Sequence, residues 1–157
     1  MHLRGTVNIR RAGLDDVDTV CDMGERFLAM HPHARLVGAK REDARRGIEA
    51  IMGVGAIFLA EIEGRICGML LCGVAPMWFA PSLLMAHELG WWVNEEARHT
   101  SAALRLIKAY EGFAAECGVR ACVMSRIHTL GEDRVGPLLE RMGYEESESQ
   151  FVKLTGG

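Results

Sequence analysis

The segment from residue 83 to residue 117 constrains the fold of this chain most, because it combines a strand, a polar loop and a helix. Residues 83–93 are dense in bulky apolar side chains and predict a strand, and residues 94–100 are a short polar loop. A strand-to-helix loop presents unpaired backbone amides at the edge of a sheet, where an anion can bind. Arg98 adds a positive charge with a planar fork of donors. The helix begins near Ser101, and its apolar residues recur at helical spacing, at Ala103, Leu106, Ile107, Tyr110, Phe113 and Ala114.

Length and composition describe a single soluble domain. The chain has 157 residues, of which 49% are hydrophobic and 25% charged, which suits one globular core. A net charge of −3 disfavours nucleic-acid binding, and no apolar run approaches the ~20 residues of a membrane span. The first residues lack the apolar segment of a signal peptide. The cysteine count is odd and most cysteines lie within apolar patterns, so reduced thiols in a cytoplasmic protein are expected; they are Cys21, Cys67, Cys72, Cys117 and Cys122.

The remaining segments predict one mixed α/β domain over residues 1–157. The order of elements is β-α-α-β-β-β-α-β-α-β, which implies a mixed, twisted sheet flanked by helices. A glycine turn at Glu63-Gly64 joins two of the strands, and Gly68 and Gly73 mark either a bulge or a close backbone approach. The predicted strands are residues 6–11, 56–62, 65–74, 83–93, 119–125 and 150–154, the last in a closing hairpin. A first helix is predicted directly after an acidic turn at 13–16, and three further helices cover 40–52, 101–117 and 131–142.

An apolar loop lies between Pro76 and Pro81 and contains Trp78 and Phe79. Aromatic side chains in a loop need burial. Three interpretations stay open: the loop covers a substrate pocket, fills a subunit contact, or packs on the protein's own core.

The loop after residue 93 resembles the acyl-CoA-binding motif of the GNAT acetyltransferase superfamily. That motif reads Arg/Gln-x-x-Gly-x-Gly/Ala after a strand and opens a helix; here it reads Arg98-His99-Thr100-Ser101-Ala102-Ala103, with Ser101 in place of the middle glycine. The resemblance covers nearly the whole chain. It implies that these six residues cradle the pyrophosphate of acetyl-CoA and that the pantetheine arm lies along Trp91, Trp92 and Val93. The Ser101 hydroxyl can cap the helix.

Glu88 is a charge in an otherwise apolar strand. Strict alternation places it on one face with Gly90 and Trp92, and His87, Leu89, Trp91 and Val93 on the other. A buried carboxylate tends to have a raised pKa, which suits a general base near neutral pH. An edge-exposed or ion-paired glutamate is the alternative from the residues alone. The resemblance favours the base, because GNAT enzymes often carry a catalytic glutamate on this strand.

The end of the chain departs from the family pattern. The stretch LLERMGYEE resembles the family's "LYEKLGF" ending, but Leu139 stands where many members have the tyrosine that protonates the departing thiolate. Glu132 falls near a position where an asparagine often contacts CoA. The proton donor is therefore open, with Ser125, His128 and Tyr144 as substitutes.

Other candidate sites are weaker. His31-Pro32-His33 has no third metal ligand nearby, so a solvated loop is expected and no metal is required; the resemblance places this segment at the border of the acceptor site. A thiol enzyme using Cys117 or Cys122 has little support, because no histidine together with an acid clusters with either cysteine.

The resulting prediction is an N-acetyltransferase that moves an acetyl group from acetyl-CoA to an amine by direct attack, with Glu88 as general base. The acceptor is a small-molecule amine or a peptide or protein amine, and the resemblance also allows a homodimer. The departures at Ser101, Glu132 and Leu139 leave one alternative, a degenerate domain that binds acyl-CoA or a protein without catalysis.

Overall fold

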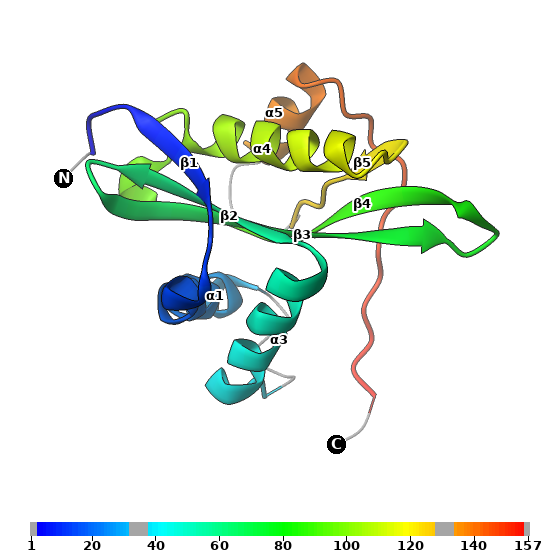
Figure 1. Cartoon of the computed structure of the whole chain (residues 1–157), viewed down its shortest axis with the longest axis horizontal. Helices are drawn as coiled ribbons and strands as arrows, with labels where there is room; N and C mark the ends of the chain where they lie inside the picture. Colours follow the sequence, from blue (N-terminus) through cyan, green and yellow to red (C-terminus); the bar gives the residue numbers. More distant parts are fainter. Residues whose placement is uncertain (1–2, 32–37, 128–133, 156–157) are drawn as a thin grey trace.

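The computed structural model describes residues 3–31, 38–127 and 134–155 and shows a sheet with helices on both faces (Figure 1). The strands are β1 (Val7–Arg11), β2 (Ala56–Ile62), β3 (Arg65–Met77), β4 (Ala80–Val93) and β5 (Ala121–Val123). The helices are α1 (Val17–Met30), α3 (Arg41–Val54), α4 (Ala102–Glu116) and α5 (Val135–Arg141), with short 3-10 turns η1 (Leu14–Asp16) and η2 (Glu95–Ala97).

The five strands follow their sequence order across the sheet. The pairings β1–β2, β2–β3 and β3–β4 are antiparallel, whereas β4 and β5 are parallel because α4 connects them. Helices α4 and α5 lie on one face and α1 and α3 on the other (Figure 1). The predicted mixed, twisted sheet flanked by helices is confirmed.

Two hydrophobic cores lie on opposite faces of the sheet. The periodic apolar residues of α4, among them Leu106, Ile107 and Tyr110, are fully buried in the first core. Val17 and Val20 of α1 and Ile48 of α3 form the second core against the other face. Strands β2 and β3 are covered on both sides, which explains why their sequences are apolar almost throughout.

Two glycines, Gly64 and Gly68, have the structural roles that the sequence predicted for them. The turn between β2 and β3 has Glu63 at φ 51° and Gly64 at φ 76°, and two left-handed residues are what a tight hairpin with the native strand twist requires. A Cβ on Gly68 would lie 3.0 Å from the Trp92 carbonyl oxygen and 3.2 Å from a Leu106 methyl, so the close approach is confirmed there. Gly73 shows no such constraint, since its nearest contact, to Leu89, would be 3.6 Å.

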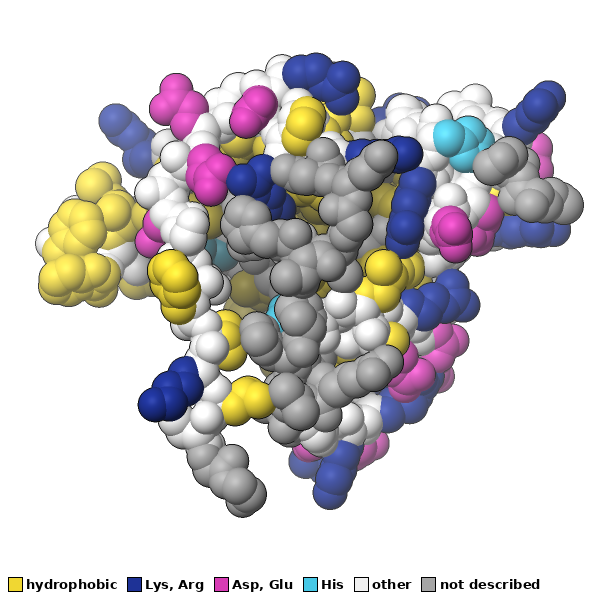
Figure 2. All heavy atoms as spheres, turned by 180° about the vertical axis from the view of Figure 1, so that it is seen from behind, with side chains coloured by type: hydrophobic (Ala, Val, Ile, Leu, Met, Phe, Trp, Pro, Cys, Tyr) yellow, Lys and Arg dark blue, Asp and Glu magenta, His cyan; other side chains and the backbone are white. Residues whose placement is uncertain are grey.

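The predicted loop between Pro76 and Pro81 is the end of a long β3–β4 hairpin. Met77 pairs with Ala80, which leaves Trp78 and Phe79 as the turn. Their side chains are 90% and 63% exposed, and the two rings contact each other edge to face at 5.2 Å. The hairpin extends beyond the body of the molecule and ends in a hydrophobic protrusion (Figures 1 and 2). The interpretation that this loop packs on the protein's own core is therefore wrong, whereas a cover over a substrate pocket and a subunit contact both stay predictions.

The predicted closing hairpin near the C-terminus is also wrong. No strand forms among residues 145–155, and the apolar side chains Phe151, Val152 and Leu154 are 98%, 58% and 47% exposed. Alternating apolar residues form a strand only where a neighbouring strand accepts their backbone hydrogen bonds, and the described sheet ends at β5. β5 itself covers only Ala121–Val123 of the predicted residues 119–125.

We predict that Trp78→Ser leaves the free energy of unfolding within about 0.5 kcal/mol of wild type, because 90% of the Trp78 side chain is exposed. Leu106→Ala, at a fully buried position, should lower it by about 2–5 kcal/mol. Urea unfolding measures both. A loss in Trp78→Ser comparable to that in Leu106→Ala would mean that the ring is covered in solution, and light scattering on the same variant tests whether a second copy covers it.

Candidate active site

The candidate site lies where β4 and β5 separate. The two strands pair only at Met85↔Ala121, Ala86↔Cys122 and His87↔Val123, yet β4 continues to Val93. We call this place, between Glu88 on β4 and Ser125 after β5, the fork. Beyond His87 the outer edge of β4 has no strand partner among the described residues. Its backbone groups can therefore bind an extended ligand as an added strand would.

A β-bulge at Leu89 sets which side chains face the fork. Leu71 of β3 pairs with Gly90 and Cys72 pairs with Glu88, so Leu89 is an extra residue in β4. The extra residue reverses the alternation of faces, and the predicted grouping of Glu88 with Gly90 and Trp92 is wrong. Trp91 and Val93 instead pack in the core beneath α4, and Trp92 packs in the core beside α1 and α3. Glu88 pairs across the strands with Cys72, whose side chain lies in the core beneath α4, so Glu88 is on the same face of the sheet.

Glu88 is held within the fork by one hydrogen bond. The backbone N–H of Ser125 donates to its Oε2 at 3.2 Å. Burial raises the pKa of Glu88 to about 7, although the hydrogen bond from Ser125 favours the charged form. No lysine or arginine in the described part of the chain forms an ion pair with this carboxylate. The ion-paired alternative is thereby contradicted, and the carboxylate changes its charge close to neutral pH.

Tyr110 fixes the other side of the fork. This fully buried α4 residue donates a hydrogen bond from its hydroxyl to the Val123 carbonyl (2.9 Å) and accepts one from the Val123 N–H (3.1 Å). Both backbone groups of the last β5 residue are therefore bonded to a side chain, at the point where the strand leaves β4.

The loop after β4 leaves a subset of its amides for an anion. The N–H groups of Arg98 and Thr100 donate to the carbonyls of Glu95 (3.3 Å) and Ala97 (3.0 Å). The Ala102 N–H donates to the Thr100 hydroxyl at 3.2 Å, so Thr100 caps α4 and the predicted cap by Ser101 is wrong. The Ser101 and Ala103 N–H groups donate no hydrogen bond to any described residue, and a helix N-terminus attracts negative charge.

Arg98, in the loop after β4, is oriented by contacts with the end of that strand. Its Nε donates to the Val93 carbonyl at 3.0 Å, and its guanidinium lies 5.0 Å from the centre of the Trp92 ring. Its two terminal nitrogens make no hydrogen bond within the described chain, so both can donate to an anion. The His99 ring, in contrast, bonds the Leu3 carbonyl at 3.1 Å and points toward the N-terminal segment.

The three strand residues of the predicted cofactor site differ in their surroundings. The Trp91 indole N–H is buried and has no hydrogen-bond partner among the described residues. Trp92 donates from its indole N–H to Asn94 Oδ1 at 2.9 Å. Val93 is buried beneath α4. Sequence reasoning assigned Asn94 only to the loop, although an amide directly after an apolar strand is a signal that it caps or anchors the strand end.

None of the described candidates is placed to act as the proton donor by a contact in the structure. Leu139, which stands where many family members have a tyrosine, is buried in the core and has no proton to donate. The Tyr144 hydroxyl is buried without a hydrogen-bond partner among the described residues, and burial together with the nearby Glu111 raises its pKa. The Ser125 backbone faces Glu88, while His128 and Glu132 lie outside the described residues.

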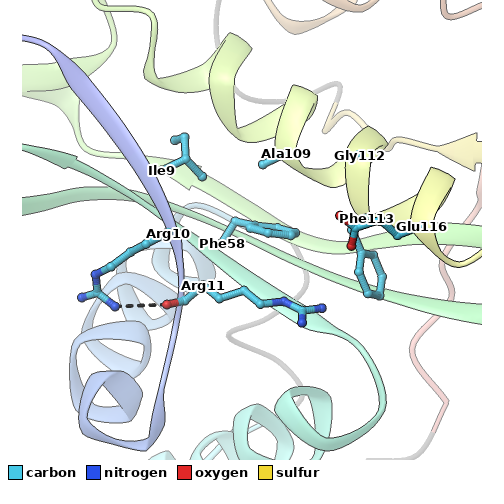
Figure 3. Close-up of a pocket in the computed structure, with 8 residues that line it drawn as sticks. All are labelled: Ile9, Arg10, Arg11, Phe58, Ala109, Gly112, Phe113 and Glu116. Atoms are coloured by element: carbon cyan, nitrogen blue, oxygen red, sulfur yellow. Dashed lines mark hydrogen bonds between the residues drawn. The ribbon is translucent and has the colours of Figure 1, made fainter.

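Among the cavities lined by described residues, one lies along β1 and α4, away from the fork. It measures about 420 Å³, and Figure 3 shows Arg11 reaching along it toward Phe113, with the guanidinium 5.2 Å from that ring and 5.9 Å from the Phe58 ring. No residue of the predicted site lines it; the lining is Ile9, Arg10, Arg11, Phe58, Ala109, Gly112, Phe113 and Glu116.

The second cavity, about 250 Å³, adjoins the fork through Ser125. Leu139 and Tyr144 also line it, as do five charged residues: Arg126, Glu140, Glu145, Glu146 and Glu148. Arg126 pairs with Glu146 at 2.7 Å, so the lining carries a net negative charge. A negative lining beside the fork favours a cationic ligand.

The thiols do not form a nucleophilic site. All five cysteines are free; Cys21, Cys67 and Cys72 are buried and Cys117 is exposed. Burial raises the pKa of the Cys122 thiol, the opposite of what an activated nucleophile needs. In the described ranges no three histidine, cysteine or acidic side chains are grouped as metal ligands would be. His31 packs against Phe27 at 5.8 Å, while Pro32 and His33 lie outside the described residues. None of the helices in residues 3–31, 38–127 and 134–155 has the length and apolar character of a membrane span.

The model of the acetyltransferase (GNAT) family matches residues 23–144 of this chain. The chain belongs to the GNAT acetyltransferase family, which confirms the resemblance seen in its sequence.

Solved structures share this fold over nearly the whole chain. A ribosomal-protein-alanine N-acetyltransferase from Brucella melitensis biovar Abortus 2308 is 16% identical, with a TM-score of 0.75, over 96% of this chain and 100% of that one. AAC(6')-Iy, in complex with the bisubstrate analog CoA-S-monomethyl-acetylneamine, is 16% identical with a TM-score of 0.75, over 98% and 100%. A predicted acetyltransferase with acetyl-CoA from Clostridium acetobutylicum is 12% identical with a TM-score of 0.69, over 96% of each chain. No curated protein sequence gives a significant match.

The raised pKa of Glu88 predicts how stability depends on pH. The pKa is 4.5 in the unfolded chain and about 7 in the folded protein, so the folded state favours the protonated carboxyl. The resulting stability is fully present below pH 4.5 and is lost as pH rises to about 7, by up to about 3 kcal/mol. Urea unfolding of wild type and Glu88→Gln between pH 4 and 9 should show this fall in wild type alone. Glu116→Gln, at an exposed position, should follow wild type; a parallel course for Glu88→Gln would mean an ordinary pKa.

Proposed function

We propose that this protein is an acetyl-CoA-dependent N-acetyltransferase in which Glu88 is the general base. The observation that carries the proposal is the position of the Glu88 carboxylate within the fork, half-buried, bonded to the Ser125 backbone and without an ion-pair partner in the described chain. A carboxylate with a pKa near 7 accepts a proton near neutral pH and is regenerated readily. Family membership supports acyl transfer as the reaction class.

The residues around the fork fit an acyl-CoA. The Arg98 guanidinium and the free Ser101 and Ala103 amides are donors that suit a pyrophosphate. The open edge of β4 along Trp91, Trp92 and Val93 offers backbone groups to the amide-containing pantetheine arm. The orphaned Trp91 indole N–H is a buried donor that such a ligand could satisfy. His99, Thr100 and Ala102 belong to the loop through their backbone, since the His99 ring and the Thr100 hydroxyl bond other protein groups.

The proposed chemistry is a direct transfer. Glu88, directly or through one water, removes a proton from the acceptor amine, which attacks the thioester carbonyl. The new C–N bond forms as the C–S bond breaks, and the departing thiolate takes up the second proton that the nitrogen loses on becoming an amide. Holding the amine against the thioester in the fork supplies a large part of the rate by converting an encounter between two molecules into a reaction within one complex. No covalent intermediate on the protein and no metal are part of this scheme.

The acceptor class follows from the charge beside the fork. The cavity next to Ser125 has a net negative lining, which favours an amine that is cationic before it reacts. AAC(6')-Iy was solved with an acetylneamine-based bisubstrate analog, and the Brucella structure is of a ribosomal-protein-alanine N-acetyltransferase, so folds like this one act on both small and protein amines. We favour a small-molecule amine here, with a peptide amine as the competing acceptor.

We predict that Arg98→Ala weakens CoA binding by about 10- to 100-fold, because a charge-assisted hydrogen bond to an anion contributes about 1.5–3 kcal/mol. Titration calorimetry measures the affinity. Arg46→Ala is the matched control, since Arg46 lies on α3 and pairs only with exposed Glu42. Equal affinities in wild type and Arg98→Ala would place the anion site elsewhere.

We predict that Glu88→Gln lowers turnover by about two to four orders of magnitude at pH 7 while CoA affinity stays close to wild type. The wild-type rate should rise with pH through about 7 as Glu88 loses its proton, whereas the variant should recover only at higher pH, where the free amine is plentiful. A panel of amines is first tested for acetylation by the wild-type protein. The turnover of both proteins is then measured as a function of pH with an amine that is accepted. Identical profiles would remove Glu88 from the chemistry, and CoA binding with no transfer to any amine would favour the noncatalytic alternative.

A further inference from the structure

Asn94 is a buried polar side chain at the end of β4, with 7% of its surface exposed. Its Oδ1 accepts hydrogen bonds from the Trp92 indole N–H at 2.9 Å and from Arg26 Nη1 at 3.2 Å. Its backbone N–H donates to the Cys67 carbonyl at 2.8 Å, and its carbonyl accepts from the Ala97 N–H at 2.9 Å. Asn94 therefore joins β3, the end of β4, α1 and the loop in one residue.

The Trp92 indole ring connects Asn94 to Arg98. The bond from Asn94 fixes the rotation of the Trp92 indole, and the Arg98 guanidinium lies over that indole at 5.0 Å. The Arg98 Nε bond to the Val93 carbonyl fixes the guanidinium at a second point. Ring and carbonyl together hold the guanidinium in one orientation, which a flexible side chain at an exposed position would not keep by itself.

We propose that Asn94 is a positioning residue for the anion site: through Trp92 it holds Arg98 ready for the pyrophosphate of the acyl donor without touching the donor itself. This inference rests on the proposed function of the loop. It assigns to Asn94 a share of the affinity for the pyrophosphate and none of the affinity for the pantetheine arm.

The alternative is that Asn94 only stabilises the fold. A buried amide that satisfies two donors and ends a strand contributes to stability wherever it lies, so a loss of folding free energy does not separate the two roles. The separating observable is the ratio of affinities for a ligand with and without the pyrophosphate. A general loosening of the site weakens both ligands, whereas a misplaced Arg98 weakens only the ligand that carries the phosphates.

The experiment measures the affinities of CoA and of pantetheine, which lacks the pyrophosphate, by calorimetry and by NMR titration. Asn94→Leu keeps the size of the side chain and removes the acceptor. We expect CoA affinity to fall about tenfold, as for the loss of one well-placed charged hydrogen bond, with pantetheine affinity unchanged. Asn94→Asp keeps an acceptor for Trp92 and should recover part of the loss. Asn8→Leu, the same substitution at an exposed position of β1, should match wild type.

Two further variants keep the inference open to refutation if Asn94→Leu does not fold. Trp92→Phe retains a ring beneath Arg98 and removes the N–H that Asn94 binds, so it should show the same selective loss of CoA affinity. Arg26→Met leaves the Trp92 bond intact and should lose less. Equal losses for CoA and pantetheine, or no loss in either, would overturn the positioning role. Failure of wild type to bind CoA would instead refute the proposed function of the loop, and with it this inference.

Discussion

The separation of β4 from β5 after three paired residues is the constraint on which the candidate site depends. Parallel pairing holds the strands together up to His87↔Val123, and Tyr110 occupies both backbone groups of Val123. Beyond that point β4 continues alone, with an open edge on one side and β3 on the other. Glu88 is the first residue past the last pair, so its carboxylate enters the gap and reaches the Ser125 amide. Its burial and its raised pKa both follow from this position.

The bulge at Leu89 and the loop after Val93 complete the arrangement. Without the extra residue, Trp91 and Val93 would face away from α4, and Trp92 would replace them there. The bulge instead turns Trp92 toward α1, where its indole reaches Asn94 and supports Arg98. One irregularity in one strand thus links the position of the carboxylate to the orientation of the arginine. Positioning donors in this way before a ligand binds reduces the reorganisation that binding requires.

Two surface segments expose large apolar side chains that the fold of one chain does not cover. The hairpin turn at Trp78 and Phe79 and the tail at Phe151 expose large apolar side chains, while both cores are closed. The aromatic turn extends from the body (Figure 2), so it contributes little to the stability of one chain. The tail keeps the alternation of a strand but has no neighbour in the described sheet to accept its backbone bonds. Apolar patches of this kind mark surfaces that serve contacts between molecules more often than folding.

The sequence by itself determined the helices and central strands, since apolar periodicity and glycine turns are local properties. The α4 face and the Glu63-Gly64 turn both follow from residue types within one segment, whereas the close approach at Gly68 depends on the distant residues Trp92 and Leu106. It also indicated Glu88 and the Arg98 loop as candidates. Only the tertiary structure decided the face of Glu88, because a bulge depends on how β3 pairs with β4. The same holds for the cap by Thr100 and the role of Asn94, whose partners are other backbone groups and distant side chains such as Arg26. Local pattern fixes which residues are apolar; pairing and packing across the chain decide which polar atoms meet.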